Sequence, residues 1–195
     1  MKNLKNIKPA LIILSTALFV FLFLKSIPVN SGNEFNIDNL PADEAPEINN
    51  KFGKWINTDK ELTIEDLKGK VVLIEFWTFG CYNCTNTLPY LKEWYEKYRS
   101  DNFEMIGIHC PEFDNERDFE NVKNSVEDLG IKYPVLTDNE FSVWKKYDVH
   151  AWPTIFLIDK KGEIRYKKVG EGKYDRTEQM IKELLNESYS AGKDN

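Results

Sequence analysis

The segment Val71–Trp77 constrains the fold of this chain more than any other. Its sequence, VVLIEFW, is an almost continuous run of β-branched, aliphatic and aromatic residues. Such a run is typical of a central strand that is buried on both faces of a sheet. Apolar side chains then recur at helical spacing between Thr85 and Arg99, so a helix is expected soon after this strand.

Strand and helix patterns continue to alternate along the rest of the chain, and a hairpin turn at Lys160–Gly162 joins the last two strands. This order predicts an α/β fold, a three-layer α/β/α sandwich with a central mixed sheet. The strands are expected at 52–57, 71–77, 103–109, 133–138, 154–159 and 163–169, and helical segments at 63–70, 85–99, 119–129, 139–148 and 180–185.

Length and charge limit the number of domains and the class of partner. The chain has 195 residues, enough for one domain of about 150 residues with extensions, and we place that domain at 48–190. The only charges before Glu34 are four lysines, so this leader carries +4 and the remaining residues −10, for a net charge of −6. An acidic body argues against nucleic acid as a partner.

The first 30 residues are expected to direct export. Ala10–Leu24 is an uncharged apolar run of 15 residues, which is short for a bilayer core about 30 Å thick but could just span it if extended to Val29. A cleaved signal peptide ending near Val29–Ser31 is the alternative. We favour an uncleaved anchor at residues 10–29, followed by a polar spacer at 31–47. Both interpretations place the body outside the cytoplasmic membrane, in the periplasm or at the cell exterior.

Two of the three cysteines, Cys81 and Cys84, follow the predicted central strand with two residues between them. A structural zinc site needs about four ligands, and this chain offers only one more cysteine, Cys110, and two histidines, His109 and His150. A disulfide between Cys81 and Cys84 would close a very small loop and would stabilise the fold weakly. The pair is therefore interpreted as exchanging thiols.

This interpretation has a mechanism. Cys81 opens a helix, where unpaired amides and the helix dipole stabilise a thiolate that can attack a disulfide. Cys84, one turn later on the same side of the helix, can then resolve the mixed disulfide. Exported proteins carry disulfides that such a pair could act on.

Four features in a fixed order carry a resemblance to a known family. VVLIEFWTFGCYNC joins the strand to the cysteines, Pro89 follows Cys84 by five residues, AWPT occupies Ala151–Thr154, and KKGEI forms the last hairpin. With these motifs about three quarters of the chain resembles the thioredoxin superfamily. The resemblance implies that Glu75 stands where thioredoxins keep a buried aspartate, and that Pro153 follows a cis peptide bond and lies against the cysteines.

The subgroup is narrowed by an additional helix and strand at Asn115–Thr137. This insertion, the segment KELTIEDLKGK and the leader resemble the TlpA/ResA-like group of exported thioredoxin-like proteins. The resemblance implies that Glu112 assists the thiols. The segment FWTFGCYNCTNTLP is also similar to the active-site loops of DipZ-type domains. Tyr82-Asn83 between the cysteines, Glu75 and Cys110 depart from the family pattern.

The resemblance implies a protein thiol-disulfide oxidoreductase that reduces disulfides of exported proteins, with apocytochrome c as one candidate, using electrons from a membrane donor. No cation lies between the cysteines, and Glu75 and Glu112, if ionised, would destabilise a thiolate; both favour a reductant over an oxidant. The expected catalytic residues are Cys81, Cys84, Glu75, Glu112 and Pro153, and the expected substrate-binding residues are Trp77, Trp152 and Thr154, with no metal and no cofactor.

Plainer interpretations stay open. Glu75 could be a salt-bridged core carboxylate rather than the acceptor of a proton from Cys84, and Trp77 and Trp152 could simply pack in the core. Cys110 is interpreted as a small buried hydrophobe. Thr78, three residues before Cys81, allows a peroxiredoxin-type peroxidase, although Ile74 stands where that class has a proline. A redox-inactive binding module is the third class, and the intact cysteine pair argues against it.

Overall fold

A computed structural model describes residues 43–100 and 102–189 of the chain. The predicted anchor or signal peptide at 1–30 and most of the predicted spacer lie outside the described residues. Within the described ranges, every helix is too short or too polar to cross a bilayer. The described residues belong to one compact unit.

The unit is built on a seven-stranded sheet in the order β1-β7-β6-β3-β4-β5-β2. The central strand β3 pairs parallel with β4 and antiparallel with β6, so the sheet is mixed. The strands are β1 Asp43–Glu44, β2 Trp55–Ile56, β3 Val71–Trp77, β4 Phe103–His109, β5 Val135–Thr137, β6 Thr154–Ile158 and β7 Glu163–Val169.

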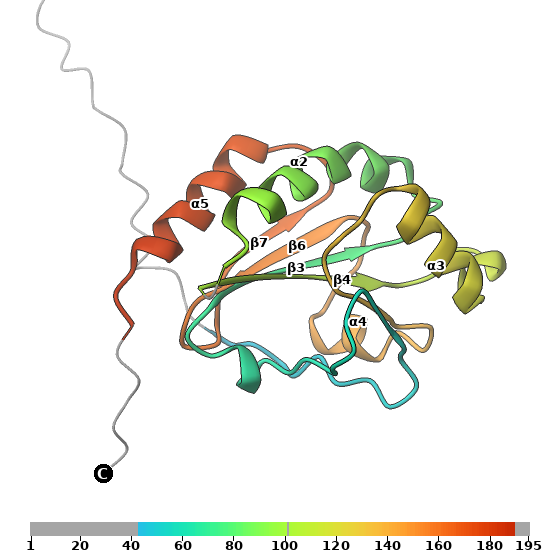
Figure 1. Cartoon of the computed structure of the whole chain (residues 1–195), viewed down its shortest axis with the longest axis horizontal. Coiled ribbons are helices and arrows are strands. Elements are labelled where there is room, and N and C mark those ends of the chain that lie inside the picture. The colour runs from blue at the N-terminus through green and yellow to red at the C-terminus, as the bar shows by residue number, and fades with distance from the viewer. Residues whose placement is uncertain (1–42, 101, 190–195) are drawn as a thin grey trace, which may run out of the picture. The chain divides into compact units, whose positions relative to one another are not determined.

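Helices cover both faces of this sheet (Figure 1). Helices α2 and α5 lie across one face and α4 lies against the other, which gives the three layers of a thioredoxin-like sandwich and confirms the predicted fold class. The helices are α2 Tyr82–Tyr98, α3 Phe119–Asp128, α4 Ser142–Lys146 and α5 Tyr174–Asn186, with 3₁₀ turns η2 Glu65–Leu67 and η3 Asp114–Arg117.

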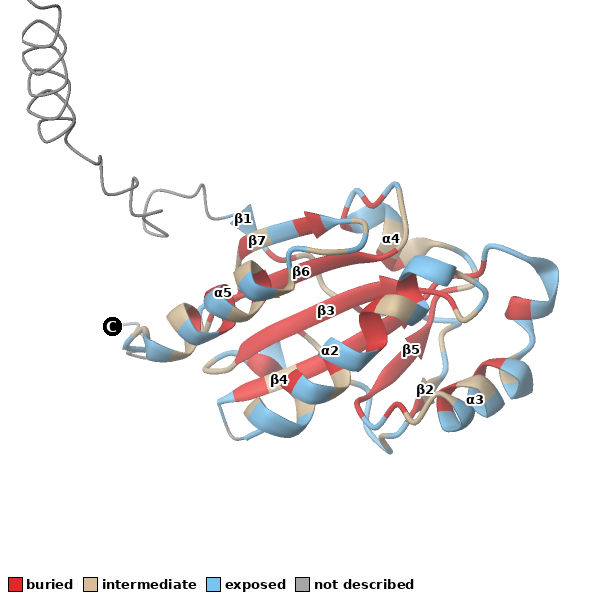
Figure 2. Ribbon diagram, turned by 90° about the horizontal axis from the view of Figure 1, so that it is seen from above, coloured by how far each residue is buried: buried red, intermediate tan, exposed pale blue. Residues whose placement is uncertain are grey.

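Strand β3 is buried along its whole length, as its sequence predicts (Figure 2). Successive side chains of a strand point to opposite faces. Val72, Ile74 and Phe76 join a core cluster that includes Val143 of α4 and Tyr147, and we call this side the α4 face. The alternate residues of β3, among them Glu75, point to the other side, which we call the α2/α5 face.

Several boundaries differ from the sequence-based expectation. Helix α2 begins at Tyr82 with Cys81 as its N-cap, as expected of the cysteine pair, whereas the apolar spacing marked the helix only from Thr85. Helix α4 is shorter than the expected 139–148, because the Asp138 carboxylate accepts the first N–H groups of the helix, from Ser142 onward. Helix α5 begins at Tyr174, before the apolar residues that predicted it.

Residues 43–47, which we expected to belong to the spacer, contact the folded unit. Strand β1 pairs with β7 at the edge of the sheet. The Glu47 carboxylate accepts the backbone N–H groups of Ile64 and Glu65, at 3.0 and 3.1 Å, and so holds the start of η2. These contacts tie residues 43–47 to the folded unit, and the domain boundary at residue 48 stays a prediction. The sequence gives little warning, because β1 has only two residues and both are exposed.

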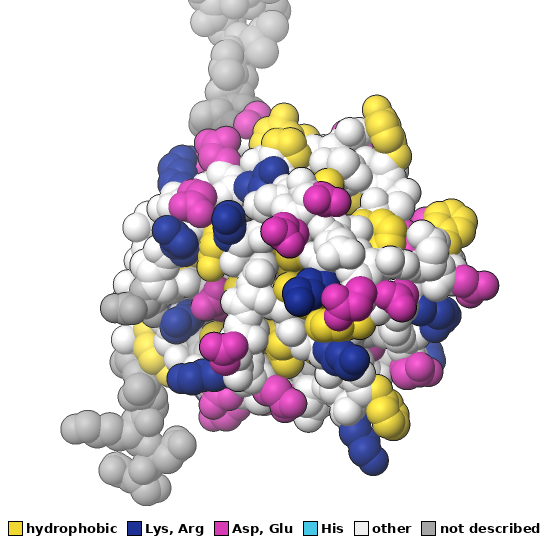
Figure 3. Space-filling view, turned by 45° about the vertical axis from the view of Figure 1, so that its right-hand side comes forward, with side chains coloured by type: hydrophobic (Ala, Val, Ile, Leu, Met, Phe, Trp, Pro, Cys, Tyr) yellow, Lys and Arg dark blue, Asp and Glu magenta, His cyan; other side chains and the backbone are white. Residues whose placement is uncertain are grey.

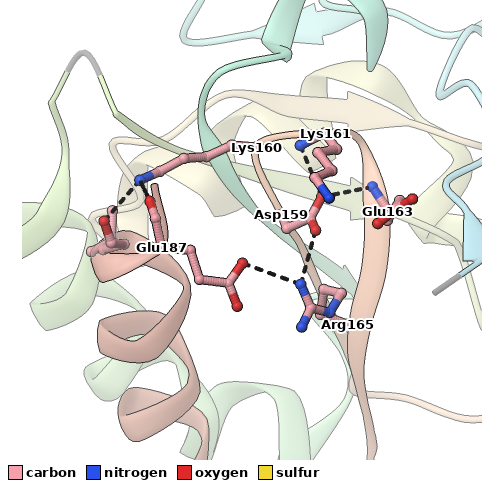
Figure 4. Close-up of polar contacts among 7 residues, drawn as sticks. Asp159, Lys160, Lys161, Glu163, Arg165 and Glu187 are labelled. Atoms are coloured by element: carbon pink, nitrogen blue, oxygen red, sulfur yellow. Dashed lines mark hydrogen bonds and ion pairs between the residues drawn. The ribbon is translucent and has the colours of Figure 1, made fainter. Parts of the chain in front are cut away.

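A polar network closes the end of the sheet where β6 turns into β7 (Figure 4). Asp159 accepts the backbone N–H groups of Lys161 and Glu163, which forms the turn. Arg165 bridges Asp159 and Glu187, and Lys160 donates to the carbonyl oxygens of Leu185 and Glu187 at the end of α5. The hairpin and the end of the last helix are thereby tied together.

Candidate active site

The two cysteines stand at the first turn of α2, beyond the end of β3. Cys81 is the N-cap, and its sulfur accepts a hydrogen bond from the Cys84 backbone N–H at 3.4 Å. Both thiols are free, but Cys81 is partly exposed whereas Cys84 is buried. One sulfur is thus accessible to another molecule, and the second lies behind it within the first turn of the helix. Pro89 lies within α2, as the resemblance implies.

The buried thiol and Glu75 influence one another. Burial raises the pKa of Cys84, and the Glu75 carboxylate raises it further. Burial also raises the pKa of Glu75 to about 8. The hydrogen bond from Tyr133 and the charge of Lys168 lower this pKa, but by less than burial raises it. Glu75 is therefore a carboxyl that can hold or release a proton near neutral pH, next to a thiol that resists losing one.

Two side chains that the sequence did not single out surround Glu75. The Tyr133 hydroxyl donates to Glu75 Oε2 at 3.3 Å, and Tyr133 is itself fully buried. The other carboxylate oxygen, Glu75 Oε1, is buried without a hydrogen-bond partner. An unpartnered buried oxygen favours the protonated carboxyl, since that form loses less on leaving water.

The second is Lys168, a lysine that is only 4 % exposed. Glu75 pairs with Ile155 across β3 and β6, and Ile155 pairs with Lys168 across β6 and β7, so the three residues form one row across the sheet. Lys168 donates to the Gly170 carbonyl. Burial lowers the pKa of Lys168, whereas Glu75 and Glu171 oppose this shift. A buried cation therefore stabilises the ionised form of Glu75.

The proline loop lies at the same end of the sheet. The Trp152–Pro153 peptide bond is cis, which confirms that expectation. Thr154, the first residue of β6, pairs with Phe76 near the end of β3, and its hydroxyl donates to the Ala151 carbonyl at 2.7 Å. The pairing brings the loop beside the strand that leads to the cysteines.

The predicted substrate-binding residues differ in exposure. Trp77 is fully buried, edge-on to His109, with ring centroids 5.3 Å apart. Thr154 is also fully buried. Trp152 is partly exposed and packs on Trp144, with ring centroids 4.7 Å apart. Of the three, Trp152 is the one that the structure offers to another molecule.

In the segment that follows β4, the structure buries Glu116 rather than the predicted Glu112. The side chain of Glu112, which the resemblance singled out, is exposed. Glu116, four residues later, is fully buried, and its Oε1 accepts the Gly80 backbone N–H at 2.8 Å, one residue before Cys81. The sequence could not show this, because Glu116 lies in a short polar segment with no apolar period.

The remaining candidates lie apart from the thiols or within the core. Cys110 is buried in the core cluster of the α4 face, with its sulfur 3.8 Å from Asp138 Oδ2. His150 is exposed and pairs with Asp148. Over the described ranges 43–100 and 102–189, no three His, Cys, Asp or Glu side chains gather as metal ligands.

Comparison with known proteins agrees with this geometry. The family model described as AhpC/TSA family matches residues 41–167. Protein DipZ of Mycobacterium tuberculosis is 39% identical over 146 residues, which cover 74% of this chain and 21% of DipZ. Thiol-disulfide oxidoreductase ResA of Bacillus thuringiensis is 33% identical over 144 residues, which cover 72% of this chain and 80% of ResA. The chain thus spans about a fifth of the length of DipZ and most of the length of ResA.

Solved structures lead to the same group. A thiol-disulfide isomerase from Corynebacterium glutamicum superimposes with a TM-score of 0.65 at 30% identity, over 77% of this chain and 99% of that one. The thioredoxin-like superfamily protein SPOA0173 has a TM-score of 0.69 at 25% identity, over 75% of this chain and 99% of that one.

Proposed function

Because this chain belongs to the AhpC/TSA family of thioredoxin-like proteins, we propose that it is a protein thiol-disulfide oxidoreductase whose reactive pair is Cys81 and Cys84. The observation that carries the proposal is the asymmetry of the two thiols. Cys81 is partly exposed at the N-terminus of α2, whereas Cys84 is buried beside Glu75. An exposed attacking thiol and a sheltered resolving thiol are what two-step exchange requires.

The reaction proceeds in two displacements. The Cys81 thiolate attacks one sulfur of a substrate disulfide, so that a mixed disulfide forms and the other substrate sulfur leaves as a thiolate. Cys84 then loses its proton, attacks the Cys81 sulfur and releases the second substrate sulfur. Two electrons pass to the substrate and the protein is left with a Cys81–Cys84 disulfide. A dithiol donor restores the reduced pair.

Glu75 is proposed to accept the proton that Cys84 loses. Its carboxyl is the acidic group that most raises the pKa of Cys84, and its own pKa of about 8 makes it a base whose ionised fraction grows through neutral pH. Lys168 raises that fraction, because a buried cation favours the carboxylate. Lys168 is thus proposed as a positioning residue that acts through Glu75.

The substrates are proposed to be disulfides of exported proteins, with apocytochrome c among the candidates and a membrane protein as electron donor. The apolar run at 10–24 supports an extracytoplasmic location and an anchor at residues 10–29. An exposed lipoprotein thioredoxin of Streptococcus pneumoniae is 30% identical over 64% of this chain, with a TM-score of 0.54. The partly exposed Trp152 and the proline loop are the proposed contact for an extended substrate segment.

Charge does not favour one sign of substrate on the surface seen in Figure 3. Basic and acidic side chains are interspersed there, and hydrophobic side chains lie between them. Single-sign fields are what steer charged partners over distance. Recognition is therefore proposed to depend on contact close to Cys81 rather than on long-range attraction.

The peroxidase alternative is weakened by the position of Thr78. This residue is fully buried, and its hydroxyl lies 3.3 Å from His109 Nε2. A hydroxyl engaged inside the fold is not presented to a peroxide at Cys81.

Reduction of insulin by the protein, with dithiothreitol as donor, tests the proposed function. We expect faster precipitation of the insulin B chain than with dithiothreitol alone, and no more consumption of hydrogen peroxide than by an ordinary thiol. Peroxide consumption without insulin reduction would indicate the peroxidase, and neither activity would indicate a binding module. A reduction potential of about −270 mV for the cysteine pair would support a reductant. One of about −120 mV would mean that the protein oxidises its substrates instead.

A further inference from the structure

We propose that Glu116 is a positioning residue for the reactive thiols. From the segment after β4 its carboxylate holds the loop that presents Cys81 and keeps a negative charge at that loop. The inference rests on the proposed function only in taking Cys81 as the reactive thiol.

Both oxygens of the Glu116 carboxylate are used. Oε1 accepts the Gly80 N–H at 2.8 Å, and Oε2 accepts the N–H groups of Glu112 and Phe113 at 2.5 and 2.9 Å. The last two bonds are local and close the first turn of η3. The bond to Gly80 joins residues 36 positions apart and connects the inserted segment to the loop between β3 and α2.

The loop is shaped for this close approach. A Cβ atom on Gly80 would overlap with Glu116 Oε1. The absence of a side chain at Gly80 therefore allows the Glu116 carboxylate to reach the backbone N–H one residue before Cys81.

Two buried side chains extend the contact into the core. The Thr78 hydroxyl is one of the groups that lower the pKa of Glu116, and it lies 3.3 Å from His109 Nε2. His109 ends β4 and pairs with Trp77 at the end of β3, so the chain of contacts runs from the sheet to the loop.

Glu116 is an anion in this setting. Burial opposes its charge, but hydrogen bonds from Phe113, Thr78, Glu112 and Gly80 outweigh burial and lower its pKa. His109 brings no charge near neutral pH, because burial lowers its pKa to about 4. Because Glu116 Oε1 contacts the Gly80 N–H, one residue before Cys81, this charge belongs to the loop that presents the reactive sulfur.

The experiment compares four variants of the full chain. Glu116→Gln keeps the shape of the side chain but removes its charge and replaces one acceptor oxygen by a donor. Asp114→Asn is the matched control, because it removes one charge from the same segment at an exposed position. Thr78→Val removes the hydroxyl, and Thr78→Ser restores it.

The first readout is the rate of Cys81 alkylation by iodoacetamide against pH, measured in proteins that also carry Cys84→Ser. The second is the equilibrium of the intact pair with glutathione. For Glu116→Gln we expect the alkylation midpoint to fall by at least about half a pH unit, a threefold change in proton affinity. We expect the glutathione equilibrium to move about threefold toward the dithiol, because a more stable thiolate stabilises the reduced form.

Asp114→Asn should stay within about 1.5-fold of the wild type in both readouts, because it is exposed and screened. Thr78→Val leaves the Glu116 carboxylate charged, so its midpoint should not fall as that of Glu116→Gln does, and Thr78→Ser should match the wild type. Equal shifts in Glu116→Gln and Asp114→Asn would overturn the proposal, as would wild-type values in a folded Glu116→Gln. If Glu116→Gln does not fold, Thr78→Val decides, because a midpoint that falls while the Glu116 charge is kept would overturn the proposal and one that does not fall supports it. Neither readout needs a protein substrate, so failure of insulin reduction would leave this inference standing.

Discussion

On the α4 face, β3 contributes Val72, Ile74 and Phe76 to an apolar core, whereas on the α2/α5 face the same strand contributes Glu75, buried beside Lys168. Phe76 packs against the rings of Tyr147 and Phe156, at centroid distances of 5.4 and 5.8 Å. One face therefore stabilises the fold through contact alone. The other keeps titratable groups out of water, and burial there raises the pKa of Glu75 to about 8, close to the range that proton transfer needs.

The cysteine pair gives the largest expected effect on the α2/α5 face. Cys81→Ser should lower insulin reduction at least about 100-fold, because the attacking sulfur is gone. Cys84→Ser should also stop turnover, but it should accumulate mixed disulfides through Cys81, since the resolving thiol is missing. Non-reducing electrophoresis with a disulfide substrate separates the two variants. Trapping by Cys81→Ser and not by Cys84→Ser would reverse their roles.

Stability against pH should show the cost of burying Glu75. Between about pH 4.5 and 8 the unfolded carboxyl is ionised while the folded one keeps its proton, so stability falls as pH rises through this window and loses nothing more above it. The total reaches up to about 5 kcal/mol, at about 1.4 kcal/mol for each pKa unit. Glu75→Gln should remove this slope.

Urea unfolding of both proteins at each pH measures the difference. The comparison also cancels His109, whose pKa of about 4 acts in the opposite sense and lowers stability as pH falls below about 6.5. Parallel curves for the wild type and Glu75→Gln would mean that Glu75 is not protonated in the folded protein.

Phe76→Ala tests the apolar face. We expect a loss of about 4 kcal/mol, because the change leaves a cavity among aromatic rings. The loss should be the same at pH 5 and pH 8, since no titratable group is removed. A loss that varies with pH as the Glu75 effect does would show that the two faces are not independent.

Lys168→Met should have the smallest effect. Without the cation the pKa of Glu75 rises, so the pH at which the Cys84 step reaches half of its maximum rate should increase by about one unit. Stopped-flow resolution of a preformed mixed disulfide measures that step. Lys167→Met, on an exposed neighbour, is the control, and an equal shift in both variants would remove Lys168 from its proposed role.

Sequence periodicity predicted the ranges of the long strands well and the ends of the helices poorly. The predicted ranges of β3, β4 and β7 agree with the structure, because long apolar or alternating runs define them. The apolar pattern marked α2 only from Thr85, because Tyr82 and Asn83 are exposed and interrupt it. Such boundaries depend on a cap or on a pairing partner, which a local pattern does not contain.

The sequence likewise predicted some residues of the site and missed others. The spacing of Cys81 and Cys84 and the resemblance at Glu75 pointed to the thiols and their buried carboxyl. Lys168 and Glu116 were missed, because both are charged residues in polar surroundings and are buried by partners distant in sequence. Only the strand pairing, which places Lys168 in one row with Ile155 and Glu75, connects this lysine to the site. Glu116 does so only through its bond to Gly80.

The hairpin end of the sheet also fixes how the protein can be attached to something larger. β1, where the described chain begins, pairs with Glu163 and Ile164 beside the hairpin, and Arg165 and Lys160 hold Glu187 at the end of α5 there too. Thr154, at the other end of β6, lies beside the end of β3 that leads to Cys81. A tether joined at Asp43 or beyond Glu187 would therefore enter from the end opposite to the thiols. Held in this way, the domain would point its reactive sulfur outward and could swing it through an arc set by the length of the tether.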